Sequence, residues 1–454
     1  MTNHNTQVLF FLLPILIHTT HACFSLINIY YQANIILFRG STLAAFLRSK
    51  ENQMNNEQPL MNTYGRLPVA FESGDGCWLY DTDGNKYFDT FFGIAVCGLG
   101  HTHPAVTKAI KDQASRLIHC SNLFHNPLQT RLASKLCDVS GMEKVFFSNS
   151  GAEANEAAIK LARKYGHEKG IKAPTIIVME QSFHGRTMAT LTATGNRKAQ
   201  AGFEPLLSGF VRTSFNDINE INKIAKSNTN IVAILLEPVQ GEGGLTIADN
   251  NYLKAIREVC DQHDWLMMLD EVQTGNGRTG HYFAYQDADI LPDVVTTAKG
   301  LGNGFPIGAC LTRGRANLVL TPGSHGSTFG GNPLGCAAAL ATIDEIMTHN
   351  LCDRAKVLGE RILTTLKSEL LDANYVADIR GKGLMIGIEM TSPCPELVPL
   401  AKAKGLLLNV TAEKVIRLLP SLSMSDEECN FLIDAVVQII RLYAADDRSK
   451  PRSN

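Results

Sequence analysis

The sequence has no excess of charge of either sign. Its 42 lysines and arginines are balanced by 44 aspartates and glutamates, which leaves a formal net charge of −2. A nearly neutral chain has no electrostatic reason to bind nucleic acid or an anionic membrane, so we expect neither as a partner. Hydrophobic residues make up 45% of the chain and glycine occurs 37 times, which is ordinary for an α/β enzyme with many tight turns.

The sequence also lacks the spacing of a metal, redox or dinucleotide site. Its eleven cysteines are scattered from Cys23 to Cys429, and no two of them form a CxxC pair. We therefore expect reduced cysteines and a cytoplasmic protein. His101 and His103 have no cluster of Cys, Asp or Glu to complete a metal site, so no metal is expected. The run GEGG at 241–244 lacks the GxGxxG spacing of a dinucleotide site.

The first 38 residues contain no Asp, Glu, Lys or Arg. Their apolar run VLFFLLPILI is ten residues long, which is too short to span a bilayer. A signal peptide would begin with positive charge and end at a clear small-x-small cleavage site, and neither is found here. Three interpretations stay open: a weak membrane anchor, a targeting peptide, or upstream sequence translated before a start at Met54 or Met61. We favour the third and expect residues 1–53 to lie outside the fold; a native mass that includes them would contradict it.

Length and pattern predict an α/β enzyme. At 454 residues the chain exceeds a single compact core, which favours two domains or one large domain with a smaller partner. Apolar runs alternate with amphipathic helices through the middle of the chain, which predicts a mostly parallel central sheet covered by helices on both faces. The expected strands are 145–148, 175–179, 231–236, 265–269 and 294–297, and the expected helices are 152–165 and 252–263.

Two further patterns flank this sheet. Alternating residues around Asp83-Gly84 predict a β-hairpin at 76–88. From about Gly335 onward, helical patterns surround a strand at 384–389 and end in a helix at 426–443, which predicts a smaller C-terminal α+β domain. The expected parts are an opening segment at 1–53, an N-terminal segment at 54–110 that packs with the small domain, a large cofactor-binding domain at 111–320, the smaller domain at 321–445 and a tail at 446–454.

Two strand ends carry the strongest functional signal. Asp270 ends one apolar strand, and Lys299 follows another and precedes the glycine-rich run GLGNG. Open α/β sheets bind ligands at the carboxyl ends of their strands. A single strand-end Asp can simply cap the next element, and most single lysines lie in solvent. The pair supplies what pyridoxal-phosphate (PLP) chemistry needs: an amine for the cofactor aldehyde, and a carboxylate that keeps the pyridine nitrogen protonated. Displaced by substrate, Lys299 can act as a general base.

A phosphate site should accompany such a pair. Gly151 and Ala152 lie between a strand and the start of a helix, where backbone N–H groups and the helix dipole favour an anion. The alternative is a plain helix cap, because Ser150 and Glu153 have capping-box spacing. The run GSTFGG, with hydroxyls on Ser327 and Thr328, can reach the same phosphate or can be only a flexible loop.

Four further residues are candidates for holding cofactor or substrate. Phe183 can place its ring against the cofactor, although an isolated Phe is usually a core residue. Arg186 can reach a carboxylate. Arg417 is the one charge in the apolar strand VIRLL, so it either faces water at a strand edge or binds a carboxylate. Glu237 ends the strand at 231–236 and could pair with Arg417.

Several motifs jointly resemble the class III (fold type I) PLP-dependent aminotransferases over about residues 67–443, and within them the acetylornithine branch. The resemblance rests on the following stretches: GIAVCGLGHTHPAV at 93–106, SNSGAEANEAAIKLAR at 148–163, FHGRT at 183–187, EPVQGEGG at 237–244, LDEVQTGNGRTG at 269–280, AKGLGNGFPIGA at 298–309 and HGSTFGGNPLGCAAA at 325–339. It implies transfer of the δ-amino group of acetylornithine to 2-oxoglutarate in arginine biosynthesis, with PLP as cofactor.

The resemblance also implies a role for each candidate residue. Cofactor contacts would come from Lys299 (covalent), Asp270 (pyridine nitrogen), Val272 and Phe183 (the two ring faces), Gln273 (the phenolic oxygen), and Gly151 and Ala152 (phosphate), the last being more often Thr in the family. Ser327 and Thr328 would come from the neighbouring subunit, so a homodimer would share its active sites. Arg186 and Arg417 would bind substrate carboxylates, and Glu237 would mask Arg417 when a substrate offers it no acid.

Other functions share these features. Ornithine, succinyl-diaminopimelate and 4-aminobutyrate aminotransferases have the same core motifs. A PLP decarboxylase or aminomutase would share the cofactor but would not need an oxoacid. A catalytically silent protein of the same fold is the alternative from another class, and the presence of both Lys299 and Asp270 argues against it.

Overall fold

A computed structural model describes residues 59–449. The chain divides into two compact units, Met1–Pro68 and Val69–Asn454. In the first unit, the described residues 59–68 contain no helix or strand. The opening segment that we predicted at 1–53 lies outside the described residues.

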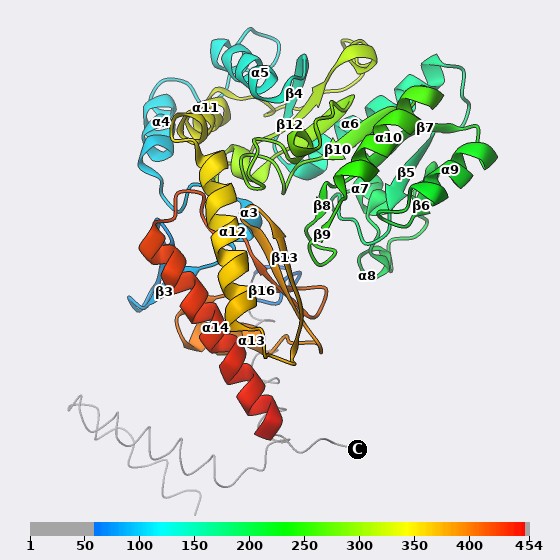
Figure 1. Ribbon diagram of the computed structural model, residues 1–454. Helices are drawn as coiled ribbons and strands as arrows, with labels where there is room; N and C mark the ends of the chain where they lie inside the picture. Colours follow the sequence, from blue (N-terminus) through cyan, green and yellow to red (C-terminus); the bar gives the residue numbers. More distant parts are fainter. Residues whose placement is uncertain (1–58, 450–454) are drawn as a thin grey trace, which may run out of the picture. The chain divides into compact units, whose positions relative to one another are not determined.

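The second unit contains a seven-stranded sheet (Figure 1). Its order is β4 (Lys144–Ser148), β12 (Gly308–Thr312), β11 (Val294–Thr297), β10 (Leu266–Asp270), β7 (Ile231–Leu236), β5 (Thr175–Met179) and β6 (Phe210–Thr213). The pairs from β11 through β6 are parallel, and β12 runs antiparallel to both of its neighbours. The prediction of a mostly parallel sheet is confirmed.

Alternate residues of each buried strand point to opposite helical layers, as the twofold repeat of a strand requires. In β10, Leu266 and Met268 pack in a cluster with α6 (Gly151–Glu168), while Met267 and Leu269 pack in a cluster with α10 (Asn250–His263). The alanine-rich face of α6 lets that helix approach the sheet closely, and its alanines at 154, 157, 158 and 162 are buried. The sheet is therefore covered on both faces.

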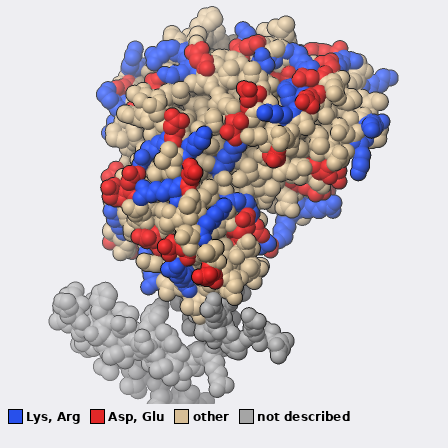
Figure 2. All heavy atoms as spheres, in the orientation of Figure 1, with Lys and Arg blue, Asp and Glu red and all other residues tan. Residues whose placement is uncertain are grey.

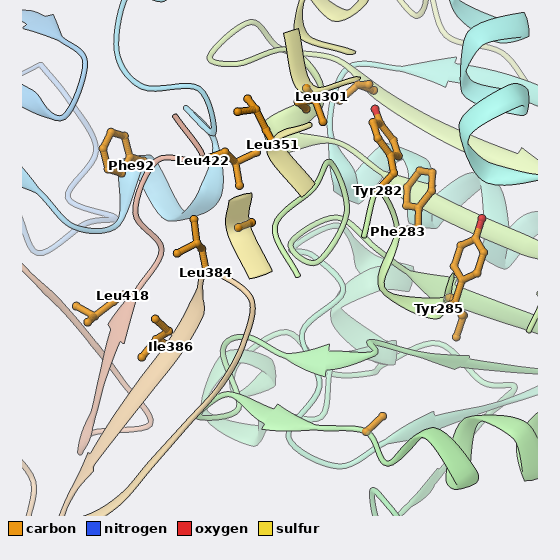
Figure 3. Packing of buried hydrophobic residues seen from close by; sticks show 14 of the residues in the cluster. Phe92, Tyr282, Phe283, Tyr285, Leu301, Leu351, Leu384, Ile386, Leu418 and Leu422 are labelled. Atoms are coloured by element: carbon orange, nitrogen blue, oxygen red, sulfur yellow. The ribbon is translucent and has the colours of Figure 1, made fainter. Parts of the chain in front are cut away.

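A second sheet is antiparallel and belongs to the smaller C-terminal α+β domain, which is also confirmed. Its order is β13 (Val376–Lys382), β14 (Met385–Met390), β17 (Val415–Leu418) and β16 (Asn409–Thr411). One face of this sheet is apolar: Ile386 and Leu418 lie opposite each other on neighbouring strands and join the main core (Figure 3). The loop at 241–245 packs against the other face. Helices α12 (Leu351–Glu369) and α13 (Leu397–Ala403) contact this sheet, and α14 (Asp426–Ser449) packs against both of them. Helix α11 (Pro333–Thr348) packs against α12 and against the helices at 104–114 and 127–140.

The hairpin expected around Asp83-Gly84 is present. Asp81 accepts hydrogen bonds from the backbone N–H groups of Asp83 and Asn85, and Gly84 has a φ of +81°. The strands β1 (Phe71–Asp75), β2 (Trp78–Asp81) and β3 (Lys86–Asp89) form a third sheet, in which β3 pairs with β15 (Leu406–Leu407). The domain boundaries given above remain predictions.

The remaining elements are short or lie at the surface. They are α3 (Phe92–Ala95), α4 (Pro104–Ala114), α5 (Pro127–Ser140), α7 (Met188–Ala193), α8 (Arg197–Gln200), α9 (Ile218–Ser227), β8 (Val239–Gln240), β9 (Thr246–Ile247) and the 3-10 helices η2 (Ala284–Ala288), η3 (Lys299–Leu301) and η4 (Gly314–Ala316). Acidic and basic side chains are interspersed over the face shown in Figure 2. Every cysteine that the structure describes is free. Within residues 59–449, no helix combines the length and apolarity needed to cross a bilayer.

Candidate active site

The carboxyl ends of the central strands surround a cavity of about 420 Å³. Asp270, the last residue of β10, and Lys299, two residues after β11, both line it. The structure therefore brings together an amine and a carboxylate that are 29 positions apart in the sequence. Gly151, Ala152, Phe183, Arg186, Glu237, Val272 and Gln273 also line this cavity. Its volume suits a small-molecule ligand.

Three donors fix the carboxylate of Asp270. Its Oδ2 accepts from Asn155 Nδ2 at 2.7 Å and lies 2.8 Å from His184 Nδ1, and its Oδ1 accepts from the Val272 backbone N–H at 3.0 Å. A carboxylate only accepts, so the proton lies on Nδ1 of the histidine. Thr296 in turn donates to Asn155 Oδ1 at 2.6 Å. Such charge-assisted bonds hold the carboxylate oxygens in place.

The surroundings of Lys299 favour the neutral, reactive form of its amine. Lys299 has a φ of +45°, in the left-handed region that a residue other than glycine rarely adopts. Within residues 59–449, its amine has no hydrogen bond or ion pair. Burial, and then the positive charge of Arg417, lower the pKa of Lys299 below its ordinary value. A lysine with a lowered pKa is neutral more often, and only the neutral amine attacks a carbonyl carbon.

The start of α6 also lines the cavity, with Ser150, Gly151 and Ala152. The Ser150 hydroxyl accepts from the Glu153 backbone N–H at 3.2 Å, so the capping interaction is present. The backbone N–H groups of Gly151 and Ala152 belong to the first turn, where the helix offers them no carbonyl partner. A Cβ at Gly151 would lie 2.7 Å from a methyl carbon of Val272. Any larger residue at this position would have to displace the Val272 side chain.

Phe183 and Glu237 are linked at the cavity wall. The backbone N–H of Phe183 donates to Glu237 Oε1 at 2.9 Å, and that of Gly241 donates to Oε2 at 3.4 Å. Burial, and then the charge of Asp270, raise the pKa of Glu237 well above its ordinary value, which favours its neutral form. The guanidinium of Arg186 lies over the Phe183 ring, 5.6 Å from its centroid, and is exposed to solvent.

Ser327 and Thr328 do not line the cavity of their own chain. The Ser327 hydroxyl accepts from Asn149 Nδ2 at 3.1 Å, and Thr328 is exposed. Their expected contribution to the active site of a neighbouring subunit stays a prediction.

The structure corrects the expected partner of Arg417. This residue lies in β17, its side chain is 1% exposed, and its Nη1 forms an ion pair with Glu242 Oε1 at 2.6 Å. Its Nε and Nη2 both donate to Asn409 Oδ1, at 2.9 and 2.7 Å. Glu237 is not the partner in this structure, because its carboxylate binds backbone N–H groups and its raised pKa favours a neutral group.

Three residues at or near the site, Asn155, His184 and Glu242, were not among the candidates predicted from the sequence. Asn155 is the amide on the alanine-rich buried face of α6, and a polar residue on such a face is a signal that could have been used. His184 lies within FHGRT beside the residues that were selected. Glu242 lies in the turn between two short strands, and nothing local distinguishes it from Glu237.

The residues present fit PLP. An amine without a partner, a carboxylate fixed by three donors, and an anion-binding helix start face one cavity with the Phe183 ring and the Val272 methyl groups on its walls. These groups correspond to the aldehyde, the pyridine nitrogen, the phosphate and the two ring faces of the cofactor. Among residues 59–449, no three His, Cys, Asp or Glu side chains are grouped as a metal site would need.

Known proteins give the same assignment. The sequence profile of the family described as "Aminotransferase class-III" matches residues 60–440. The acetylornithine aminotransferase of Nitrosomonas europaea is 58% identical over 384 residues, which cover 85% of this chain and 98% of that protein. Acetylornithine aminotransferase 1 of Bordetella pertussis is 50% identical, with 86% and 99% covered.

Solved structures agree with the sequence relatives. Acetylornithine aminotransferase from Elizabethkingia anophelis matches with a TM-score of 0.77 and 33% identity, over 86% of this chain and 98% of that one. Ornithine aminotransferase from Toxoplasma gondii, whose active site holds PLP at partial occupancy, matches with a TM-score of 0.84 and 30% identity, over 90% of this chain and all of that one. The chain is a PLP-dependent transaminase of fold type I and belongs to the class-III aminotransferases.

Proposed function

We propose that this enzyme transfers the δ-amino group of N2-acetyl-L-ornithine to 2-oxoglutarate, giving N-acetylglutamate 5-semialdehyde and L-glutamate, in arginine biosynthesis. The observation that carries the proposal is the buried arginine Arg417, which is covered by the partly exposed Glu242. Its Nη1 donates at 3.4 Å to Oε1 of Gln273, a residue that lines the same cavity as Lys299. The relatives named acetylornithine aminotransferase support the choice of donor.

The protein contributes binding, orientation and proton transfer. When bound, PLP supplies an aldehyde that condenses with amines and a ring that withdraws electrons. Asp270 would hold the pyridine N–H with a carboxylate that Asn155, His184 and Val272 keep in place. Lys299 would take the proton from the substrate carbon that bears the amino group, because its lowered pKa suits a general base.

The two substrates differ at the carbon that reacts. In acetylornithine this carbon carries no carboxylate, whereas in 2-oxoglutarate a carboxylate is attached directly to the keto carbon. An arginine next to this position must be neutralised in the first half-reaction and free in the second. Glu242, whose side chain is 33% exposed, can turn away, while Arg417 is buried and held by Asn409. The carboxylate at the far end of either substrate would then bind Arg186 at the exposed side of the cavity.

We also propose that the active enzyme is a homodimer with shared active sites, working in the cytoplasm. Large apolar side chains are exposed close to the loop with Ser327 and Thr328, since Asn122 donates to Ser327 O and Gly330 O. These exposed residues are Leu117, Ile118, Leu123, Phe124 and Phe329. Clustered exposed apolar residues are typical of an interface. The free cysteines suit a reducing compartment. Light scattering at micromolar concentration should give the mass of a dimer.

An amino-donor panel with 2-oxoglutarate as acceptor tests the substrate. Acetylornithine should give the highest kcat/KM, and acetylornithine alone should bleach the yellow holoenzyme. The second candidate is ornithine transamination, which the similarity to the Toxoplasma ornithine aminotransferase favours. A panel in which ornithine, 4-aminobutyrate or succinyl-diaminopimelate is preferred over acetylornithine would refute the proposed donor.

A further inference from the structure

Residues 241–245 form the turn between β8 and β9 and lie on one face of the second sheet. We call them the gate loop, because Glu242 within them covers Arg417. A Cβ at Gly244 would lie 3.5 Å from Val415 of β17, and a Cβ at Gly387 of β14 would lie 3.3 Å from the Cβ of Leu245. The gate loop is thus in van der Waals contact with this sheet.

A row of residues across four strands forms the surface below the gate loop. The row runs from Arg380 on β13 to Gly387 on β14, Arg417 on β17 and Asn409 on β16, each opposite the next. Residues directly opposite in antiparallel strands point to the same face. Because Gly387 has no side chain, the row has a gap between its two arginines, and Leu245, which is fully buried, packs over this gap.

Arg380 holds the gate loop by its main chain. Its Nε donates to the carbonyl oxygens of Gly244 and Leu245, each at 3.2 Å, and its Nη2 donates to Gly244 O at 2.5 Å. Its Nη1 binds the carboxylates of Asp378 at 2.8 Å and Glu389 at 2.7 Å. These two acids neutralise the guanidinium, so the contribution of Arg380 to the gate loop is a fixed set of hydrogen bonds and not a free charge.

Two more contacts hold the other end of the gate loop. The Thr411 hydroxyl donates to Glu242 O at 2.7 Å, and Arg417 Nη1 donates to Gly241 O at 3.2 Å. Four of the five carbonyl groups of the gate loop are therefore bound by side chains of one sheet. The side chain of Glu242 remains the partly exposed element that can turn.

We propose that Arg380, Gly387 and Thr411 are positioning residues for substrate selection, which hold the main chain of the gate loop while the Glu242 side chain moves between the two half-reactions. This inference rests on the proposed function. With a loosened main chain, Arg417 would be uncovered for part of the time. An uncovered arginine favours a donor whose reacting carbon bears a carboxylate, such as glutamate, over acetylornithine.

The test is Arg380→Met in the full-length holoenzyme, measured as the ratio of kcat/KM for acetylornithine to kcat/KM for glutamate. We expect this ratio to fall about tenfold, which corresponds to about 1.4 kcal/mol. Thr411→Val, which removes no charge and creates no cavity, should lower the ratio in the same direction, and it keeps the test decisive if Arg380→Met fails to fold. Hydrogen exchange should become faster at the amides of 241–247 in both variants.

The matched control is Lys414→Met. Lys414 binds the same Glu389 at 2.7 Å, but it has no hydrogen bond to the gate loop. The Lys414→Met variant should have the wild-type ratio of kcat/KM values and the wild-type rate of hydrogen exchange at the amides of 241–247. An unchanged ratio in Arg380→Met and Thr411→Val, or an equal loss for both donors, would overturn the proposal. The donor panel is measured first, on the wild-type enzyme. If the wild type prefers another ω-amino donor over acetylornithine, the ratio is measured with that donor. The gate-loop proposal is therefore tested separately from the proposed substrate.

Discussion

Gly151→Ala should weaken PLP binding while leaving the fold intact. The added Cβ would lie 2.7 and 2.9 Å from the two methyl carbons of Val272, and contacts between carbon atoms normally lie at about 3.5–4.0 Å. In the enzyme without cofactor, Val272 can shift into the cavity that it lines. The gain in helix propensity, up to about 1 kcal/mol, then offsets much of the strain. With cofactor present Val272 cannot shift, and overpacking costs about 1–3 kcal/mol.

This cost predicts that the Kd for PLP is roughly five- to 150-fold higher than in the wild type. The melting temperature of the cofactor-free variant should stay close to that of the cofactor-free wild type. Titration of the cofactor-free enzyme with PLP measures the first quantity and calorimetry the second. The double variant Gly151→Ala, Val272→Ala should bind PLP more tightly than the sum of the two single-variant losses in binding free energy predicts. The reason is that the shorter side chain at 272 removes the clash with the Cβ at 151. Gly98→Ala is the control, since its Cβ would meet Arg278 at an ordinary 3.8 Å. Wild-type PLP affinity in Gly151→Ala would refute the reasoning.

Three other substitutions test separate parts of the site. Glu242→Gln leaves Arg417 without its anion, so kcat/KM for acetylornithine should fall about tenfold while that for 2-oxoglutarate is kept; equal losses would contradict this. Asn155→Leu removes the 2.7 Å bond to Asp270 and should weaken PLP binding by about tenfold or more in the same titration; unchanged binding would count against the network. Burial raises the pKa of Glu271 to about 7. The folded state then binds more protons between pH 4.5 and 7, so stability falls as pH rises through this window, by up to ~3 kcal/mol. Glu271→Gln should flatten the dependence of melting temperature on pH, and parallel curves would show the assignment to be wrong.

The sequence was sufficient for the elements whose signal is local. β5, β7 and β11 have the predicted bounds, because each is a short buried apolar run with a clear end. Asp270 and Lys299 could be selected because a polar residue at the end of such a strand must lie at the ligand edge of the sheet. β12 was not predicted, since neither its place between β4 and β11 nor its reversed direction is visible in five residues.

Pairings between distant residues could not be predicted in this way. Glu237 and Glu242 lie five residues apart, on either side of β8, and both could reach Arg417 by sequence alone. Which of the two glutamates pairs with Arg417 depends on how the gate loop packs on the second sheet, whose strands lie more than 130 residues later in the chain. Likewise, Asn155 and His184 meet Asp270 only because α6 and the segment after β5 lie beside β10.

The reversed strand β12 keeps ten consecutive residues at the rim of the pocket. Thr297 of β11 pairs with Ala309 of β12, so the chain turns back at the same edge and does not cross to the far side of the sheet. Six residues of this return line the cavity: Ala298, Lys299, Gly304, Phe305, Pro306 and Ile307. A parallel successor would have carried most of them away through a crossover helix. Libraries that aim to widen the range of accepted amines can therefore concentrate on 302–307, where a change in loop shape reaches the substrate without disturbing the strands that support it.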